Sequence, residues 1–244
     1  MLRTSDALRR LRLDATDGEL GQVEEFYFDD DTWTIRYFVV RTGSWLSGRT
    51  VLISPRFVTG ADWDAHRLAV SLTMDQVRHG PDVSTDRPVS RLQEIEYLRH
   101  YDQTPYWMLG AEVGGSAIAI DAAMRAAAAE AEAAGSDPPT HLRSSREVRG
   151  YHIEASDGSL GHLRAYLIDD ETWRVRYLVV DTSTWWFGKD VVIAPEWVSK
   201  VSWGGRSLHV DHTRDTIRSS PAYDPRTPMS KTYAASLDAH FRKP

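Results

Sequence analysis

The sequence predicts a mainly β protein built from two small repeated barrels, each with a C-terminal helical tail. The first observation is an internal repeat: a shift of 140 positions carries Trp33 onto Trp173, and residues 3–101 align without a gap with 143–241. A gap-free match of this length indicates one structural unit used twice. The second observation is the close spacing of about six short apolar segments in each repeat, which is typical of a small closed or nearly closed barrel.

The repeat also sets the expected domain boundaries. We predict a first repeat at 1–101, a second at 142–244, and a linker at 102–141 between them. The linker is rich in Ala and Glu, so we expect it to be partly helical. It opens with Tyr106-Trp107-Met108-Leu109, an apolar cluster that we expect to dock on a barrel.

Composition narrows the classes of function. Charged residues make up 26% of the 244 positions and hydrophobic residues 41%, close to the globular average. No cysteine is present, which excludes disulfides, thiolate metal sites and a cysteine nucleophile. The net charge of −6 argues against direct nucleic-acid binding, which needs clustered cations. Neither a signal peptide nor the roughly 18 apolar residues of a membrane span is present, so we expect a soluble cytoplasmic protein.

Two glycines in each repeat predict local backbone geometry. Asp17-Gly18 and Asp157-Gly158 each stand between apolar segments and predict hairpin turns, because glycine readily adopts positive φ. Gly21 and Gly161 follow three residues later, and each indicates a bulge or a close backbone approach in the outgoing strand. A phosphate-binding loop is the less favoured interpretation, since no helix start follows.

A run of acidic residues follows the next strand in each repeat, at Asp29-Asp30-Asp31 and at Asp169-Asp170-Glu171. Adjacent carboxylates suggest a calcium site. The calcium loop that a sequence reveals, however, alternates its ligands, contains a glycine and ends in a bidentate glutamate. These runs have none of those features. We therefore favour an exposed hairpin turn held by aspartate side chains.

The strand after that turn is apolar on both faces. Tyr37-Phe38-Val39-Val40 and Tyr177-Leu178-Val179-Val180 do not alternate as a half-buried strand would. One face is expected to fill the interior of the barrel. The other face needs a cover, for which the C-terminal helix of the same repeat, the other repeat and a second chain are the three candidates. The third candidate would make the protein a dimer or another homo-oligomer.

The loops at 43–49 and 183–189 are unusually aromatic. Exposed apolar side chains often mark a contact surface, so these loops supply the candidate partner-binding residues. The alternative is that Trp45 and Trp185 fold back as lids over the barrel end, with Arg49 and Lys189 as solvated strand ends. The candidate partner-binding residues are Trp45, Arg49, Trp185, Trp186 and Lys189.

Helices are expected after the strands of each repeat. Short capped turns are predicted at 73–78 and 213–218, and longer helices at 90–101 and 230–241. His100 and His240 recur at the ends of the longer helices, where a histidine favours the helix dipole. No metalloprotease, nucleophile-elbow or phosphate-loop motif occurs. We accordingly expect no enzyme, no catalytic residues, no metal site and no cofactor.

The segment DGELGQVEEFYFDDDTWTIRYFVVRTGSWLSGRTVLISP at 17–55 resembles the PRC-barrel family, as does its second copy. The family is named for the cytoplasmic domain of the photosynthetic reaction-centre H subunit, and it includes the C-terminal domain of the ribosome maturation factor RimM. The resemblance covers about 11–72 and 151–212. It implies a small β-barrel that makes protein–protein contacts and has no established catalytic residues.

Together these observations predict a tandem PRC-barrel protein that binds or scaffolds protein partners without catalysis. A ribosome-assembly or RNA-processing accessory factor is one alternative, and it rests on the resemblance alone. A metal-dependent hydrolase that uses the acidic turns is the other.

Overall fold

The computed structural model describes residues 1–81, 89–108, 141–182, 190–224 and 230–241, with single positions at 122, 125, 126 and 129. Most of the predicted linker therefore lies outside the described residues.

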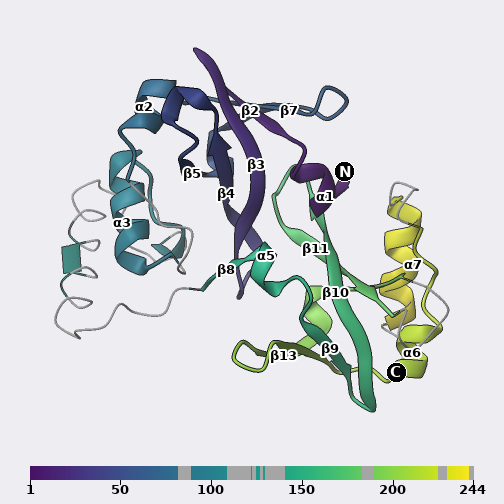
Figure 1. Cartoon of the computed structure of the whole chain (residues 1–244). Helices are drawn as coiled ribbons and strands as arrows, with labels where there is room; N and C mark the ends of the chain where they lie inside the picture. Colours follow the sequence, from purple (N-terminus) through teal and green to yellow (C-terminus); the bar gives the residue numbers. More distant parts are fainter. Residues whose placement is uncertain are drawn as a thin grey trace. The chain divides into compact units, whose positions relative to one another are not determined.

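Figure 1 shows strands of both repeats. Each repeat forms the core of one sheet, and the two sheets have the same strand order. In both, the first and last strands of the repeat's core pair in parallel, β2 with β7 and β9 with β14. The strands of the first repeat, in the spatial order β5-β4-β3-β2-β7-β6, are β2 (Arg12–Ala15), β3 (Gly18–Asp29), β4 (Thr34–Thr42), β5 (Thr50–Ile53), β6 (Val58–Asp62) and β7 (Arg67–Val70). Those of the second repeat, in the order β12-β11-β10-β9-β14-β13, are β9 (His152–Ala155), β10 (Gly158–Asp169), β11 (Val175–Asp181), β12 (Asp190–Ile193), β13 (Val198–Ser202) and β14 (Ser207–Val210).

The mainly β class is confirmed, with one correction to the predicted barrels. Each sheet is an open path within the described part of the chain, because its two end strands are not joined into a closed ring. In the first repeat the chain leaves the sheet between β5 and β6 through a 3-10 turn, Pro55–Phe57. Proline has no amide hydrogen to donate to a neighbouring strand, so the ladder stops there.

The predicted helices are confirmed, and side-chain caps explain where they begin. Thr73 and Ser90 form capping boxes with the glutamines three residues later. The tail helix of the first repeat, α3, is fixed to its own sheet by the Tyr97 hydroxyl, which accepts a hydrogen bond from the Ser54 amide at 2.9 Å. The helices are α1 (Ser5–Leu8), α2 (Met74–Arg78), α3 (Arg91–His100), α5 (Ser145–Val148), α6 (Arg214–Arg218) and α7 (Lys231–Phe241).

A seventh strand in each sheet comes from the other repeat, which the sequence did not predict. β1 (Leu2–Thr4) pairs antiparallel with β10, so that Thr4 lies opposite Leu167. β8 (Leu142–Ser144) pairs with β3 in the corresponding way. β1 and β8 are each three residues long. β1 directly precedes the short helix α1, and β8 directly precedes α5. The repeats are thus joined by exchange of their opening segments.

The exchange explains how the chain divides into compact units. One unit comprises Met1–Leu11, Val23–Phe38 and Arg143–Pro244, and the other comprises Arg12–Gln22 and Val39–Leu142. The first unit therefore contains the second repeat from Arg143 onward together with the parts of the first repeat that pair with it. The predicted domain boundaries remain a prediction.

Within the first unit the two apolar hairpins meet at a pair of tryptophans. Val175 donates its amide to the Trp33 carbonyl at 2.8 Å, and Ile35 donates to the Trp173 carbonyl at 2.8 Å. Both tryptophans have positive φ, 54° and 55°, which is unusual for a bulky side chain. Two reciprocal hydrogen bonds and ring burial hold this conformation.

The same region covers the doubly apolar strand of the first repeat. The ring of Phe38 contacts the ring of Trp173 edge-on, with centroids 5.0 Å apart. Of the three predicted covers, contact with the other repeat is therefore observed for β4. Residues 37–40 are at most 2% exposed in the single chain. Burial of this strand thus gives no reason to invoke a second chain, and a homo-oligomer stays a prediction.

Candidate functional site

The predicted turn of the second repeat anchors a helix beside the sheet. The Asp157 carboxylate accepts a hydrogen bond from the Arg214 amide, the first residue of α6, at 2.8 Å. Asp17 and Met74 make the same 2.8 Å bond in the first repeat. A turn aspartate that accepts an amide at the first turn of a helix satisfies a donor that would otherwise lack an intrahelical partner. Each hairpin turn therefore fixes the following short helix.

The predicted bulge lies three residues further along each strand. In β10 the pairing with β9 skips Leu160, because Ser159 lies opposite Glu154 and Gly161 lies opposite Ile153. Gly161 has φ of 147°, and a Cβ there would collide with the Asp181 carbonyl. The bulge and the close backbone approach are both confirmed. Leu160 is the extra residue of this bulge.

A pocket of about 250 Å³ lies between this turn, the bulge and α6. Its walls combine aliphatic side chains with charged and hydroxyl groups. It belongs wholly to the second repeat and to the first compact unit. The lining residues are Asp157, Ser159, Leu160, Thr182, Val191, Arg214, Asp215 and Arg218.

The charges of the pocket are balanced. Arg214 Nε lies 3.6 Å from Asp157 Oδ1, and Arg218 Nη1 lies 3.6 Å from Asp215 Oδ1. The hydrogen bond from the Arg214 amide lowers the pKa of Asp157, although burial opposes it. Asp157 is thus ionised at neutral pH and is a weak base.

Two of the predicted partner-binding residues belong to the first repeat, and there they make contacts within the repeat. Trp45 lies in a 3-10 turn, Ser44–Leu46, and donates its indole N–H to the Leu20 carbonyl at 2.8 Å. Arg78 lies over the Trp45 ring, 5.8 Å from its centroid. Arg49 donates to the carbonyls of Gly80 and Pro81 at 3.0 and 3.1 Å. Trp45 and Arg49 therefore contact their own repeat, and their role in partner binding stays a prediction. Trp185, Trp186 and Lys189 lie outside the described residues.

The acidic runs form hairpin turns, as predicted. Asp29 Oδ1 accepts hydrogen bonds from the Thr32 amide at 2.8 Å and from the Asp31 amide at 3.2 Å. Its other oxygen pairs with Arg36 at 3.2 Å. Asp169 repeats the pattern with the Thr172 and Glu171 amides. The first aspartate of each run is therefore occupied by its own turn.

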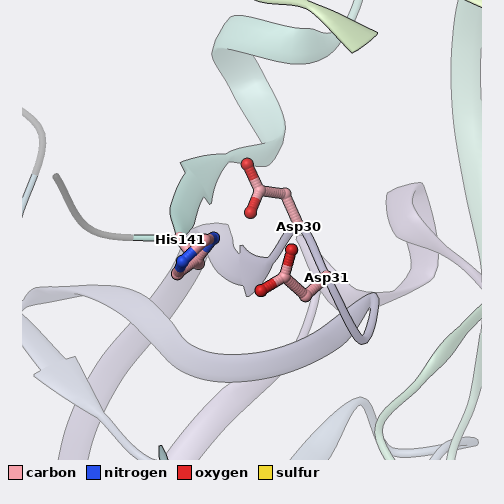
Figure 2. Close-up of side chains that lie close together, drawn as sticks. All are labelled: Asp30, Asp31 and His141. Atoms are coloured by element: carbon pink, nitrogen blue, oxygen red, sulfur yellow. The ribbon is translucent and has the colours of Figure 1, made fainter. Parts of the chain in front are cut away.

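Figure 2 shows Asp30 and Asp31 at the end of the β3 hairpin, with His141 just before β8. Asp30 accepts a hydrogen bond from Arg143 Nε at 2.8 Å, so an arginine already balances its charge. The equivalent pair, Asp170 and Arg3, lies at 2.9 Å. His141 belongs to the other compact unit, and the group carries no proposal of a metal centre.

The repeated histidines tie each tail helix to the preceding short helix. His100 Nε2 lies 2.9 Å from the Gln76 carbonyl, and His240 Nε2 lies 2.8 Å from the Thr216 carbonyl. Gln76 and Thr216 are equivalent positions in α2 and α6. The contact is therefore part of the repeated architecture, which accords with the predicted structural role.

The pocket residues were missed in the sequence because Asp157 was interpreted only as a turn residue. One signal was present. Met74 of the first repeat is replaced by Arg214 of the second, and Glu19 by Ser159, so the two repeats differ at two positions beside the same turn.

Comparison with known proteins defines the class. Residues 13–72 match the PRC-barrel domain, a span that runs from within β2 to the end of β7. The chain therefore contains a PRC-barrel domain, and its second sheet has the same strand order. No curated protein matches the chain. None of the helices in the described residues is long and apolar enough to cross a bilayer.

Proposed function

We propose that the chain is a non-enzymatic binding or scaffolding protein that acts through protein–protein contacts of its two PRC-barrel-like domains. The observation that carries the proposal is the pocket of the second repeat, whose wall contains Ser159 and Arg214 where the first repeat has Glu19 and Met74. A cytoplasmic location and a protein partner are parts of the same proposal.

A comparison of the residues that both repeats share with those that differ supports this proposal. The polar residues that both repeats keep are engaged in the fold: Asp29 and Asp169 in turns, His100 and His240 in helix contacts. A fold used twice must retain such residues in both copies. A function used once is expected where the copies diverge. Arg214 and Ser159 are divergent positions in the pocket wall, whereas the other six lining residues are the same in the first repeat.

The size and chemistry of the pocket favour a protein side chain as its occupant. A volume of about 250 Å³ lies below the roughly 300–1,000 Å³ of most small-molecule sites. The walls offer aliphatic contact from Leu160 and Val191, and balanced charge from two arginine–carboxylate pairs. Such a mixture resembles the core of a protein interface, where an anchor side chain enters a small cleft.

The test is an affinity capture with the full chain as bait. We expect one set of partners with the wild-type chain and its loss with the double variant Arg214→Ala, Arg218→Ala. Lys200→Ala, an exposed change on the edge strand β13, is the control and should keep the partners. Unchanged capture by a double variant whose circular dichroism matches the wild type would contradict the proposal. Ribosomal proteins among the partners would favour the ribosome-assembly alternative.

A further inference from the structure

We propose that His152 and His162 form a binding site for a divalent transition metal ion of the kind that imidazole prefers, such as Zn²⁺ or Cu²⁺. The two histidines belong to the hairpin of β9 and β10, within one compact unit. The motif search of the sequence had led us to expect no metal site. The histidines are not among the lining residues of the pocket, so this site goes beyond the proposed function and does not depend on it.

The strand register places the two imidazoles directly opposite each other. His152 of β9 is the register partner of His162 of β10. One position along, the Leu163 amide donates to the Tyr151 carbonyl at 2.9 Å. The His152 amide points away from β10 and donates to the Arg206 carbonyl at 2.9 Å. The histidines therefore form a non-hydrogen-bonded pair of the antiparallel ladder, the kind in which opposite side chains come closest.

The spacing of the imidazole rings fits two ligands of one ion. Their centroids lie 4.5 Å apart, with 48° between the ring planes. An ion at about 2.0–2.1 Å from a ring nitrogen lies roughly 3.2 Å from the centroid of that ring. Two rings that bind one ion at a right angle therefore have centroids about 4.5 Å apart, and at the tetrahedral angle about 5.2 Å apart. The observed spacing corresponds to the first of these arrangements.

Both imidazoles are available to an ion. Within the described ranges, neither ring takes part in a hydrogen bond or an ion pair, and their contact is with each other. His100 and His240 differ, because their ring nitrogens lie 2.9 and 2.8 Å from backbone carbonyls. His152 is exposed and His162 is half-buried, so solvent reaches the pair. A metal ligand needs such access and a nitrogen lone pair that no other group uses.

The neighbouring strand adds a carboxylate to the same face of the sheet. Asp181 of β11 is the register partner of His162 on its other side, so imidazole, imidazole and carboxylate form a row across three strands. Carboxylate oxygens also bind Zn²⁺. Arg164, two residues after His162, carries the opposite charge, but its guanidinium is paired with the Asp190 carboxylate at 2.8 Å. The row therefore suits a cation.

The histidine pair occurs in the second repeat and not in the first. Arg12 and Gln22 are register partners at the equivalent positions of β2 and β3. A guanidinium stays protonated and has no lone pair for a metal, and an amide is a poor ligand for these ions. The hairpin thus forms without histidine at either position, and the first repeat supplies replacements that do not bind.

Zinc titration of the untagged full chain tests the site. Isothermal titration calorimetry should show saturable Zn²⁺ binding, and the ring resonances of both histidines should shift in NMR spectra. His152→Arg and His162→Gln install the residues of the first repeat, so both variants should keep the circular dichroism of the wild type. Each should weaken binding by at least the roughly 10–100-fold that loss of a supporting side chain costs, because each removes a ligand. The double variant should lose little more than either single variant, since one imidazole cannot chelate.

Two controls make the assignment specific. His79→Ala removes an exposed histidine of the first repeat and should leave the titration unchanged. Mg²⁺, which prefers oxygen ligands, should not displace Zn²⁺ from the pair. Absence of saturable Zn²⁺ binding by the wild type overturns the inference, as does equal affinity in the wild type and both variants. Loss of affinity in one single variant and not in the other overturns the sharing of one ion by the two imidazoles.

Discussion

Ser5 accepts a hydrogen bond from the Tyr166 amide at 3.2 Å through its side-chain oxygen. Ser145 accepts one from the Phe26 amide at 3.1 Å. The two bonds are related by the 140-residue shift of the repeat, so each opening segment supplies a side-chain acceptor for a long strand of the other repeat. Both serines are buried, at 6% and 7% exposure. The reciprocal pair fixes the segment exchange inside the first compact unit.

Removing either serine hydroxyl should destabilise the chain. Ser5→Ala leaves the Tyr166 amide without its acceptor, and an unsatisfied buried donor costs about 1–3 kcal/mol. Ser145→Ala should cost a similar amount through the Phe26 amide. The free energy of unfolding in urea measures both. Ser156→Ala is exposed and should change it by no more than about 0.5 kcal/mol. Stability equal to that of this control in both variants would contradict the role given to the exchange.

The sequence contains enough to predict the repeat and its turns, but not the exchange. Asp157 with the following glycine predicts a turn, and Gly161 predicts a bulge, because few residues other than glycine suit positive φ or a close backbone contact. β1 and β8 are three residues long, too short for a periodic pattern, and each pairs with a strand that is far away in the sequence. Local propensity therefore accounts for α1 with its Thr4 cap, but it does not predict β1, the strand before it.

The candidate site was partly predictable for the same reason. The Trp45 loop was recognisable as unusual, and folding back was one of its two predicted outcomes. The pocket of the second repeat is assembled from a turn, a bulge and α6, and a bond between Asp157 and Arg214 joins the turn to the helix. No periodic pattern in the sequence predicts where these three elements meet. The differences between Met74 and Arg214 and between Glu19 and Ser159 were the signals that pointed to it.

Alanine at the bulge glycine should be poorly tolerated. Gly21 has φ of 151°, and a Cβ there would meet the Arg41 carbonyl, which belongs to the backbone and cannot rotate away. Backbone strain and overpacking together are expected to cost about 3 kcal/mol or more. Gly60→Ala is the control, because a Cβ there meets nothing within 4 Å. The melting temperatures of the two variants, measured by thermal unfolding, give the difference in stability. Equal melting temperatures would show that the backbone relaxes around Gly21.

The turn aspartate should matter for stability and not for metal binding. Asp29→Ala removes the acceptor of the Thr32 and Asp31 amides and the partner of Arg36, so we expect a loss of about 1–3 kcal/mol. Asp29→Asn keeps an acceptor oxygen and should lose less. Calcium at millimolar concentration should not shift the melting temperature of the wild type. A calcium-dependent rise that Asp29→Ala abolishes would restore the metal hypothesis.

Tyr101 should make the chain less stable in alkali. Burial raises its pKa to about 12 from the ordinary 10.0, although the charge of Arg49 opposes the shift. In the unfolded chain the phenol ionises near pH 10, whereas in the folded chain it stays neutral until about pH 12. Between these values the unfolded state binds fewer protons, so the free energy of unfolding falls as pH rises. The contribution is fully present below pH 10 and is lost towards pH 12.

Absorbance of tyrosinate near 295 nm follows the titration, and urea unfolding at pH 9, 10 and 11 follows the stability. Tyr101→Phe removes the ionising group and should flatten the fall in stability above pH 10. The second repeat provides a natural precedent, because Phe241 stands at the equivalent position and packs on Trp197 with centroids 3.8 Å apart. The variant ring is therefore expected to fit. An unchanged slope in Tyr101→Phe would assign the alkaline loss to other tyrosines, of which Tyr233, with its pKa also raised to about 12 by burial, is the next to replace.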